Sequence, residues 1–275
     1  MTHLAPLILL RGGGDLATGV AARLWRGGFG VVVTETEQPR AVRRLVSLAE
    51  AVYAGSVAVE DLRGERVSDA AQASAVLHRS AIPVLVDPTA AIRNDLEPAA
   101  LVDARMTKAE PDLDLSAAPF VVGLGPGFTV GFHAHAVVET NRGHRMGRVY
   151  WEGAAQPDTG IPDSVHGHDA DRVLRAPADG VFEPAAEIGT LVKSGEVLAQ
   201  VDGVAIVAAF DGALRGLLHG GIEVEAGVKV GDLDPRQDLG LCSLISDKSL
   251  AVGGGVLEAL LSQRTIRKQL AASSN

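Results

Sequence analysis

The chain has 275 residues, of which 47% are hydrophobic and 4% aromatic, and its formal net charge is −9. This length favours two domains, and the apolar fraction excludes a disordered chain. The acidic balance argues against a nucleic-acid partner, and the nearest approach to a basic run, Arg40 with Arg43 and Arg44, is interpreted as a solvated helix face.

The sequence is expected to be that of a cytoplasmic protein. A single cysteine, Cys242, cannot form an internal disulfide, so nothing indicates an oxidising compartment. The first ten residues lack the basic start of a signal peptide. No apolar run reaches the roughly 18 residues that a membrane span needs, so we expect no membrane partner.

The first half of the chain alternates short apolar strands with helices. Leu7–Leu10 reads as a strand buried on both faces, Gly12–Gly14 as a turn, and the helical spacing of Leu16 to Trp25 as a helix. This alternation predicts a mostly parallel sheet with helices on both faces. The further strands are expected at 29–34, 57–59, 82–86, 101–104, 120–124 and 135–139, and the further helices at 41–50 and 69–78, the latter capped by Ser68 or Asp69.

The second half changes character. Gly, Pro, Asp and His accumulate before Arg172, which predicts an exposed loop or linker. Short β segments separated by glycine turns follow and predict a small all-β barrel or sandwich. These segments lie at 173–175, 180–182, 190–192, 197–201, 204–209, 212–217 and 222–224; from about Leu241 the chain is helical again, with 256–268 amphipathic.

A turn pattern repeats inside the β segment, at Val192-Lys193-Ser-Gly-Glu and Val228-Lys229-Val-Gly-Asp. It resembles the corners of biotinyl and lipoyl carrier domains over residues 176–234. Such carriers present a modified lysine, but the central stretch Val201–Ile206 contains none, so this unit is expected to pack, dock or cover a cleft.

The expected fold class is α/β, with a Rossmann-like sheet, a small all-β barrel-sandwich domain and a C-terminal helix. The predicted division is a nucleotide- or cofactor-binding domain at 1–152, a loop or linker at 153–171, the β domain without carrier lysine at 172–238, and a C-terminal helical segment at 239–275.

The turn after the first strand carries the strongest functional motif. Gly12, Gly13, Gly14 and Asp15, with Ala17 in the last place, fit G-x-G-x-x-G/A between a strand and a helix. Gly12 permits a tight turn, Gly14 lets a pyrophosphate approach the backbone, and the helix N-terminus attracts the anion. The alternative is a tight strand–helix junction without a ligand.

Acidic residues end the next strand. Glu35 and Glu37 lie roughly 20 residues beyond the glycines, where a carboxylate is placed for a ribose hydroxyl. Strand, helix and acid together favour nucleotide binding over an empty junction.

Two further segments are candidates for the same cleft. Gly125 and Gly127 lie in a second glycine-rich loop after a strand, which is either part of a shared ligand crevice or a plain wide turn. In the segment containing Asn141, Arg142 and His144, the arginine is suited to clamp a phosphate or carboxylate and the histidine to donate to it. As a bare hexapeptide the segment also fits a surface turn.

Cys242 is a candidate nucleophile or chalcogen carrier, because a nearby lysine would lower the pKa of its thiol. The alternative is a small buried apolar residue. The histidine pairs His133/His135 and His166/His168 lack a third ligand at a convincing spacing, so no protein-bound metal is expected.

The motifs in combination resemble a known family. In order, the segments 11–19, 35–39, 123–128, 139–144, 175–180, 231–236 and 245–259 are similar to the YqeB-like accessory proteins of selenium-dependent molybdenum hydroxylase systems. The resemblance implies a maturation role, with a molybdopterin dinucleotide or another nucleotide as ligand. It implies the hydroxylase apoenzyme or other maturation factors as partners, and it assigns no catalytic residues. An NAD(P)-dependent oxidoreductase and a non-catalytic docking scaffold remain as alternatives.

Overall fold

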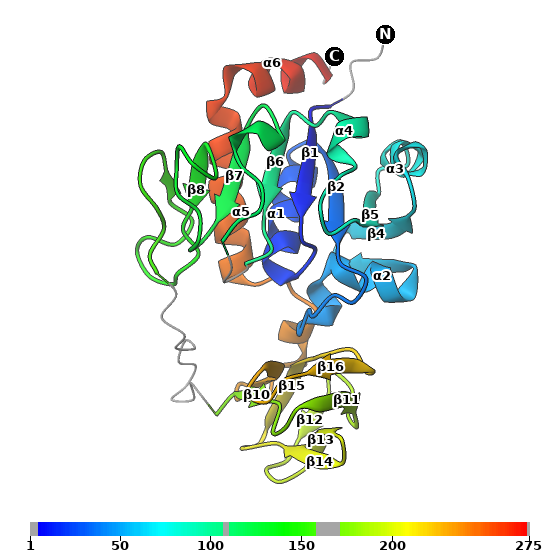
Figure 1. The fold of residues 1–275 in the computed structure, drawn as a ribbon. Helices are drawn as coiled ribbons and strands as arrows, with labels where there is room; N and C mark the ends of the chain where they lie inside the picture. The colour runs from blue at the N-terminus through cyan, green and yellow to red at the C-terminus, as the bar shows by residue number, and fades with distance from the viewer. Residues whose placement is uncertain (1–4, 107–109, 158–170, 274–275) are drawn as a thin grey trace.

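The computed structural model describes residues 5–106, 110–157 and 171–273. They form a mixed α/β structure with one large, mostly parallel sheet and two small antiparallel sheets (Figure 1). This confirms the α/β class and the mainly parallel sheet. Residues 158–170 of the expected linker, including His166 and His168, lie outside the described residues.

The large sheet is built around β1 (Leu7–Arg11), whose neighbours are β2 (Gly30–Glu35) and β6 (Ala100–Asp103). The sheet order is β3-β4-β5-β2-β1-β6-β7-β8-β9, and the strands from β4 to β8 run parallel. The order reverses between β1 and β6, which is where open α/β sheets bind ligands. The other strands are β3 (Ser56–Val59), β4 (Leu62–Val67), β5 (Ile82–Val86), β7 (Val121–Leu124), β8 (Ala136–Val138) and β9 (Val149–Tyr150).

Helices cover both faces of this sheet. Ile8 and Leu10 pack with α1 (Asp15–Arg26) and α5 (Asp247–Ser262), whereas Leu9 points to the face that carries α3 (Ala70–Leu77). The side chain of Asp69 caps α3, as predicted. The remaining helical turns are η1 (Arg44–Val46), η2 (Leu48–Glu50), α2 (Ala51–Ala54), α4 (Arg93–Leu96), η3 (Leu115–Ala117), η4 (Leu239–Cys242) and α6 (Arg264–Ser273). No helix among the described residues has the length and hydropathy that crossing a membrane requires.

The packing of α5 on α1 depends on two glycines. A Cβ on Gly19 would lie 2.4 Å from the carbonyl oxygen of Ser249, and one on Gly253 would lie 2.5 Å from that of Gly19. The C-terminal helix therefore returns to the sheet and packs on the first helix of the chain.

The Gly253→Ala variant is expected to lose about 2 kcal/mol of unfolding free energy, because the new methyl group forces the helix backbones apart. The neighbouring Gly254 has no atom within 4 Å of an added Cβ, so Gly254→Ala is expected to gain about 0.5–1 kcal/mol from reduced chain entropy. Urea unfolding of both variants checks this, and equal effects would show that the close approach does not control stability.

The two small sheets form what we call the β unit, residues 173–234. One sheet has the order β10-β17-β15-β12 and the other β14-β13-β11-β16. Their inner faces share one apolar core around Phe182, Leu198 and Leu214. The strands are β10 (Val173–Arg175), β11 (Gly180–Pro184), β12 (Leu191–Val192), β13 (Val197–Val201), β14 (Val204–Val207), β15 (Gly212–Leu217), β16 (Ile222–Val224) and β17 (Lys229–Asp234).

Several predicted elements were wrong. Instead of one helix at 41–50 there are separate turns, because this segment docks on the β unit: Leu217 N–H donates to the carbonyl of Val42 and Arg44 Nε to that of Leu217, both at 2.8 Å. The helix expected at 256–268 is two helices, broken at Gln263, whose backbone is extended. Strands β4 and β17 were missed.

Candidate functional site

A cleft lies between the carboxyl edge of the large sheet and the β unit. It consists of two cavities, of about 1160 Å³ and about 570 Å³. Both cavities are lined by Asp15 and Leu16 from α1, by Arg43, and by Arg215 and Lys229 from the β unit. The cleft is therefore shared by the two parts of the chain, and the glycine turn opens into it.

The fold requires glycine at the first two positions of the turn, whereas at Gly14 the absence of a side chain only leaves the cavity open. Gly12 has φ +98°, and a Cβ there would lie 3.2 Å from the backbone of Arg105. A Cβ on Gly13 would lie 2.9 Å from the backbone nitrogen of Ala49, whose N–H donates to the Gly13 carbonyl and fastens the turn to η2. Gly14 lines the larger cavity, and an added Cβ would meet nothing within 4 Å. A side chain at this position would therefore extend into the cavity without disturbing the fold.

The N-terminus of α1 is open toward this space. Its N-cap, Gly14, supplies no side-chain cap, and the first intrahelical bond is from Thr18 N–H to the Gly14 carbonyl. The N–H groups of Asp15, Leu16 and Ala17 have no acceptor among the described residues, and all three residues line the cavity. An uncapped helix N-terminus of this kind is a site for an anion.

Glu35 is held at the turn by its own hydrogen bonds. Its Oε1 accepts from Gly13 N–H and its Oε2 from Thr36 N–H, both at 2.8 Å. Both Glu35 and Glu37 line the larger cavity, where the sequence placed them. Their contact with a ribose stays a prediction.

The lining of the cleft is basic although the chain is acidic. The cleft contains ten of the chain's 25 Lys and Arg residues, against five acidic ones. Three of these arginines are already paired with carboxylates outside the lining: Arg11 and Arg105 with Asp112, and Arg236 with Asp234. The other cations still make the local potential positive, which favours an anionic ligand. The basic residues are Arg11, Arg40, Arg43, Arg105, Arg142, Arg172, Arg215, Lys229, Arg236 and Lys248; the acidic ones are Asp15, Glu35, Glu37, Asp232 and Asp247.

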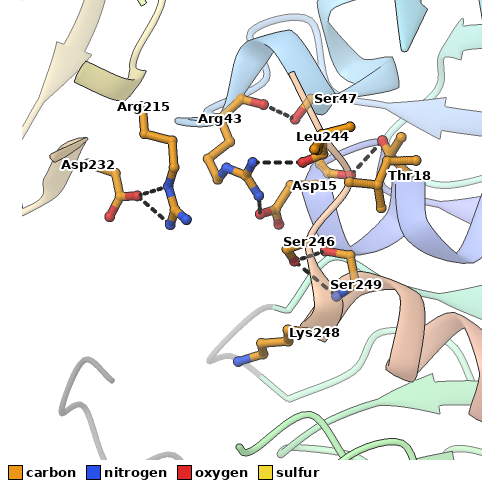
Figure 2. Close-up of polar contacts among 12 residues, drawn as sticks. Asp15, Thr18, Arg43, Ser47, Arg215, Asp232, Leu244, Ser246, Lys248 and Ser249 are labelled. Atoms are coloured by element: carbon orange, nitrogen blue, oxygen red, sulfur yellow. Dashed lines mark hydrogen bonds and ion pairs between the residues drawn. The ribbon is translucent and has the colours of Figure 1, made fainter. Parts of the chain in front are cut away.

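Arg43 lies where the parts of the cleft meet (Figure 2). Its side chain is 7% exposed, its Nη2 donates to the carbonyls of Leu241 and Leu244 at 3.1 and 3.0 Å, and its Nη1 lies 3.4 Å from Asp15. Its Nε has no acceptor among the described residues. Burial, and then the nearby charge of Arg215, lower the pKa of Arg43.

Carboxylates of the β unit organise the opposite wall. Asp232 is buried, with Arg215 at 2.6 Å and Lys229 at 3.5 Å from its oxygens. Burial raises the pKa of Asp232, but the surrounding cations more than offset this and hold it below its usual value. Asp232 is thus ionised at neutral pH and positions two cations that line the cleft.

The neighbouring Asp234 predicts acid sensitivity. Burial raises its pKa, but hydrogen bonds from Arg236 outweigh this and lower the pKa to about 2. Because the pKa is depressed on folding, Asp234 contributes stability above the unfolded value of about 3.9, and this is lost as pH falls toward 2. Urea unfolding between pH 5 and pH 2 should show a smaller decline for Asp234→Asn than for the unaltered chain; parallel curves would contradict this.

The structure does not bring all predicted residues to the cleft. Arg142 lines the smaller cavity, but its guanidinium is paired with both oxygens of Asp247, at 2.9 and 3.0 Å. Asn141, His144, Gly125 and Gly127 are not among the described residues that line either cavity. For Gly125, a φ of +71° and a Cβ position 2.5 Å from Thr140 Oγ1 explain the glycine by packing.

Cys242 lies outside both cavities, with its thiol directed at the carbonyl of Leu214. Burial raises its pKa, although Arg215 and Arg43 oppose the shift. A thiol held protonated and 2% exposed is a poor nucleophile, so the hypothesis of a reactive Cys242 gains no support.

Sequence reasoning missed the main cations. The arginine cluster at 40–44 was interpreted as a solvated helix face, which is wrong: Arg43 is buried, and Arg40 and Arg43 line the cleft. Arg11, at the end of β1, is also buried and pairs with both oxygens of Asp112 at 2.6 and 2.7 Å. The sequence did contain a signal for Arg11, because an arginine directly after a buried apolar strand indicates a cation at the edge of the sheet.

Comparison with known proteins gives one extensive sequence similarity. The chain is 43% identical over 255 residues to the uncharacterized protein YqeB of Escherichia coli strain K12. The aligned region covers 93% of this chain and 47% of that protein. The YqeB-like resemblance is thereby confirmed, and the chain spans about half the length of that relative. No protein-family profile matches the chain.

Solved structures give only weak likenesses. An aspartoacylase family protein from Mesorhizobium loti has 13% identity and a TM-score of 0.26, over 83% of this chain and 85% of that one. The ectoine utilization protein EutE from Ruegeria pomeroyi has 12% identity and a TM-score of 0.24 over the same shares. Values of this size establish no common activity.

Proposed function

We propose that the chain binds a phosphate-bearing, nucleotide-like ligand in the cleft, with a phosphate over the N-terminus of α1. The observation that carries this proposal is the open N-terminus itself: the N–H groups of Asp15, Leu16 and Ala17 face a large cavity, and Gly14 leaves room above them. Basic residues that line the cleft, Lys229 and Lys248 among them, supply the matching charge.

The arrangement of strands supports a Rossmann-like interpretation. When the parallel strands are counted along the chain from β1, omitting β4, the order β5-β2-β1-β6-β7-β8 corresponds to the 3-2-1-4-5-6 order of dinucleotide-binding folds. The repeated lysine-containing corners and the two four-stranded sheets likewise support a biotinyl/lipoyl-like barrel-sandwich for the β unit.

The role that we propose is that of an accessory protein for a selenium-dependent molybdenum hydroxylase. The sequence resemblance and the similarity to YqeB support it, although that relative is itself uncharacterized. In this role the ligand is a molybdopterin dinucleotide or a nucleotide precursor, and the partner is the hydroxylase apoenzyme or another maturation factor.

A second candidate is an NAD(P)-dependent oxidoreductase. The position of Glu35 favours it, because a carboxylate at the end of β2 is placed for the ribose of a nicotinamide dinucleotide. The same carboxylate suits the ribose of any nucleotide.

Titration calorimetry with molybdopterin cytosine dinucleotide and, separately, with NADH tests the proposal. We expect saturable binding of the pterin dinucleotide and weaker binding of NADH. Binding of NADH alone would favour the oxidoreductase, and binding of neither would remove the nucleotide proposal.

A further inference from the structure

We infer that the place where the two cavities meet is a second anion-binding subsite, completed by the β unit, so that the ligand carries more than one anionic group. We call this place the junction subsite and define it by Arg43, Arg215, Lys229 and Lys248. The inference rests on the proposed function and narrows its ligand class from any nucleotide to a polyanionic one.

The cations of the junction subsite come from separate parts of the chain. Arg43 precedes η1, Arg215 lies in β15, Lys229 begins β17 and Lys248 follows the first residue of α5. Folding brings these like charges to one cavity, where Asp15 and Asp232 reduce their repulsion and a bound anion would reduce it further. In Figure 2, Arg215 extends from the β unit toward Arg43, and Lys248 points into the space below them.

The acidic residues nearby offset only part of the charge of the four cations. Asp15 forms an ion pair with Arg43 at 3.4 Å and offsets part of the charge of that residue. Asp232 pairs closely with Arg215 at 2.6 Å and more loosely with Lys229 at 3.5 Å, and the side chain of Lys229 is 44% exposed. The side chain of Lys248 has no ion-pair partner among the described residues. Both lysines therefore retain the capacity to bind an anion.

The dipoles of α1 and α5 add to the positive potential of the junction subsite. Gly19 of α1 lies beside Ser249, and Gly27, after the end of α1, lies beside Leu257, so α1 and α5 run parallel. Both positive ends consequently point toward the β unit (Figure 1), and residues Ser246 to Lys248 line the smaller cavity. Asp247 reduces the field of α5 but is itself paired with Arg142.

Inorganic tripolyphosphate, measured by calorimetry at low ionic strength, probes the subsite without a nucleoside. We expect the Lys229→Met/Lys248→Met double variant to bind it at least about tenfold more weakly than the unaltered chain. Lys193→Met is the matched control, because Lys193 occupies the equivalent corner of the internal repeat, is 80% exposed and pairs with Asp211. It should leave binding unchanged.

The result that overturns the inference is equal tripolyphosphate affinity of the double variant and the unaltered chain, or no measurable binding by the latter. Gly14→Leu separates this failure from that of the proposed function. If Gly14→Leu loses the dinucleotide while the lysine variant binds both probes normally, the junction subsite is wrong and the glycine turn stands. If only the lysine variant loses binding, the subsite stands and the proposed phosphate position at α1 is wrong.

Discussion

Gly14→Leu is expected to weaken binding of a dinucleotide about a hundredfold or more. A phosphate over α1 would accept hydrogen bonds from at least two backbone N–H groups, each worth about 1.5–3 kcal/mol when the acceptor is charged. A leucine side chain at Gly14 would fill the space above these groups, and losing 3 kcal/mol corresponds to roughly a hundredfold change in Kd. Calorimetry with molybdopterin cytosine dinucleotide measures the loss.

The fold is expected to tolerate this change. Gly14 has φ −65° and ψ −175°, which any residue adopts, and its Cβ position is free of contacts. Gly254→Leu is the matched control, because Gly254 has equal room for a Cβ but lies outside both cavities. If both variants bind as tightly as the unaltered chain, the phosphate does not sit at α1.

Arg43→Met is expected to lower the unfolding free energy by about 2–4 kcal/mol. The substitution removes the donor to the Leu241 and Leu244 carbonyls and the cation facing Asp15, so partly buried acceptors lose their partners. Since these acceptors belong to α1 and to the segment before α5, the change loosens contacts between distant parts of the chain. Urea unfolding measures it.

Two further substitutions define the origin of this effect. Arg63→Met removes an arginine that is 68% exposed and paired with Glu65, and should change stability by no more than about 0.5 kcal/mol. Arg43→Lys keeps the charge but not the forked donor geometry, so an intermediate stability is expected. If Arg43→Met were as stable as Arg63→Met, the conclusion that Arg43 holds α1 and the segment before α5 together would be contradicted.

The elements that the sequence predicted well are those in which one local pattern decides the structure. β1 is apolar because it is buried on both faces, and α1 follows it with apolar residues at helical spacing. The glycine turn between them needs Gly12 for its backbone angle. Strand β4, which contains Arg63, Glu65 and Arg66, has no such pattern because part of it faces solvent, and only its pairing with β3 and β5 defines it.

Of the candidate site, only the part formed by the glycine turn and Glu35 was predictable from the sequence. The turn and Glu35 lie within 25 residues of one another and follow a known spacing. Arg43 and Arg215 are 172 positions apart, and no periodicity relates them. They meet because the segment before η1 docks on β15 through Val42 and Leu217, a contact that depends on the tertiary arrangement of the two parts.

The most direct test of the central claim is mass spectrometry of the ligand released from protein purified from a molybdenum- and selenium-replete host. A phosphorus-containing nucleotide should be released by the unaltered chain and by Gly254→Leu, and should be absent from Gly14→Leu. Equal amounts of nucleotide from Gly14→Leu and the unaltered chain would contradict a phosphate site at the N-terminus of α1.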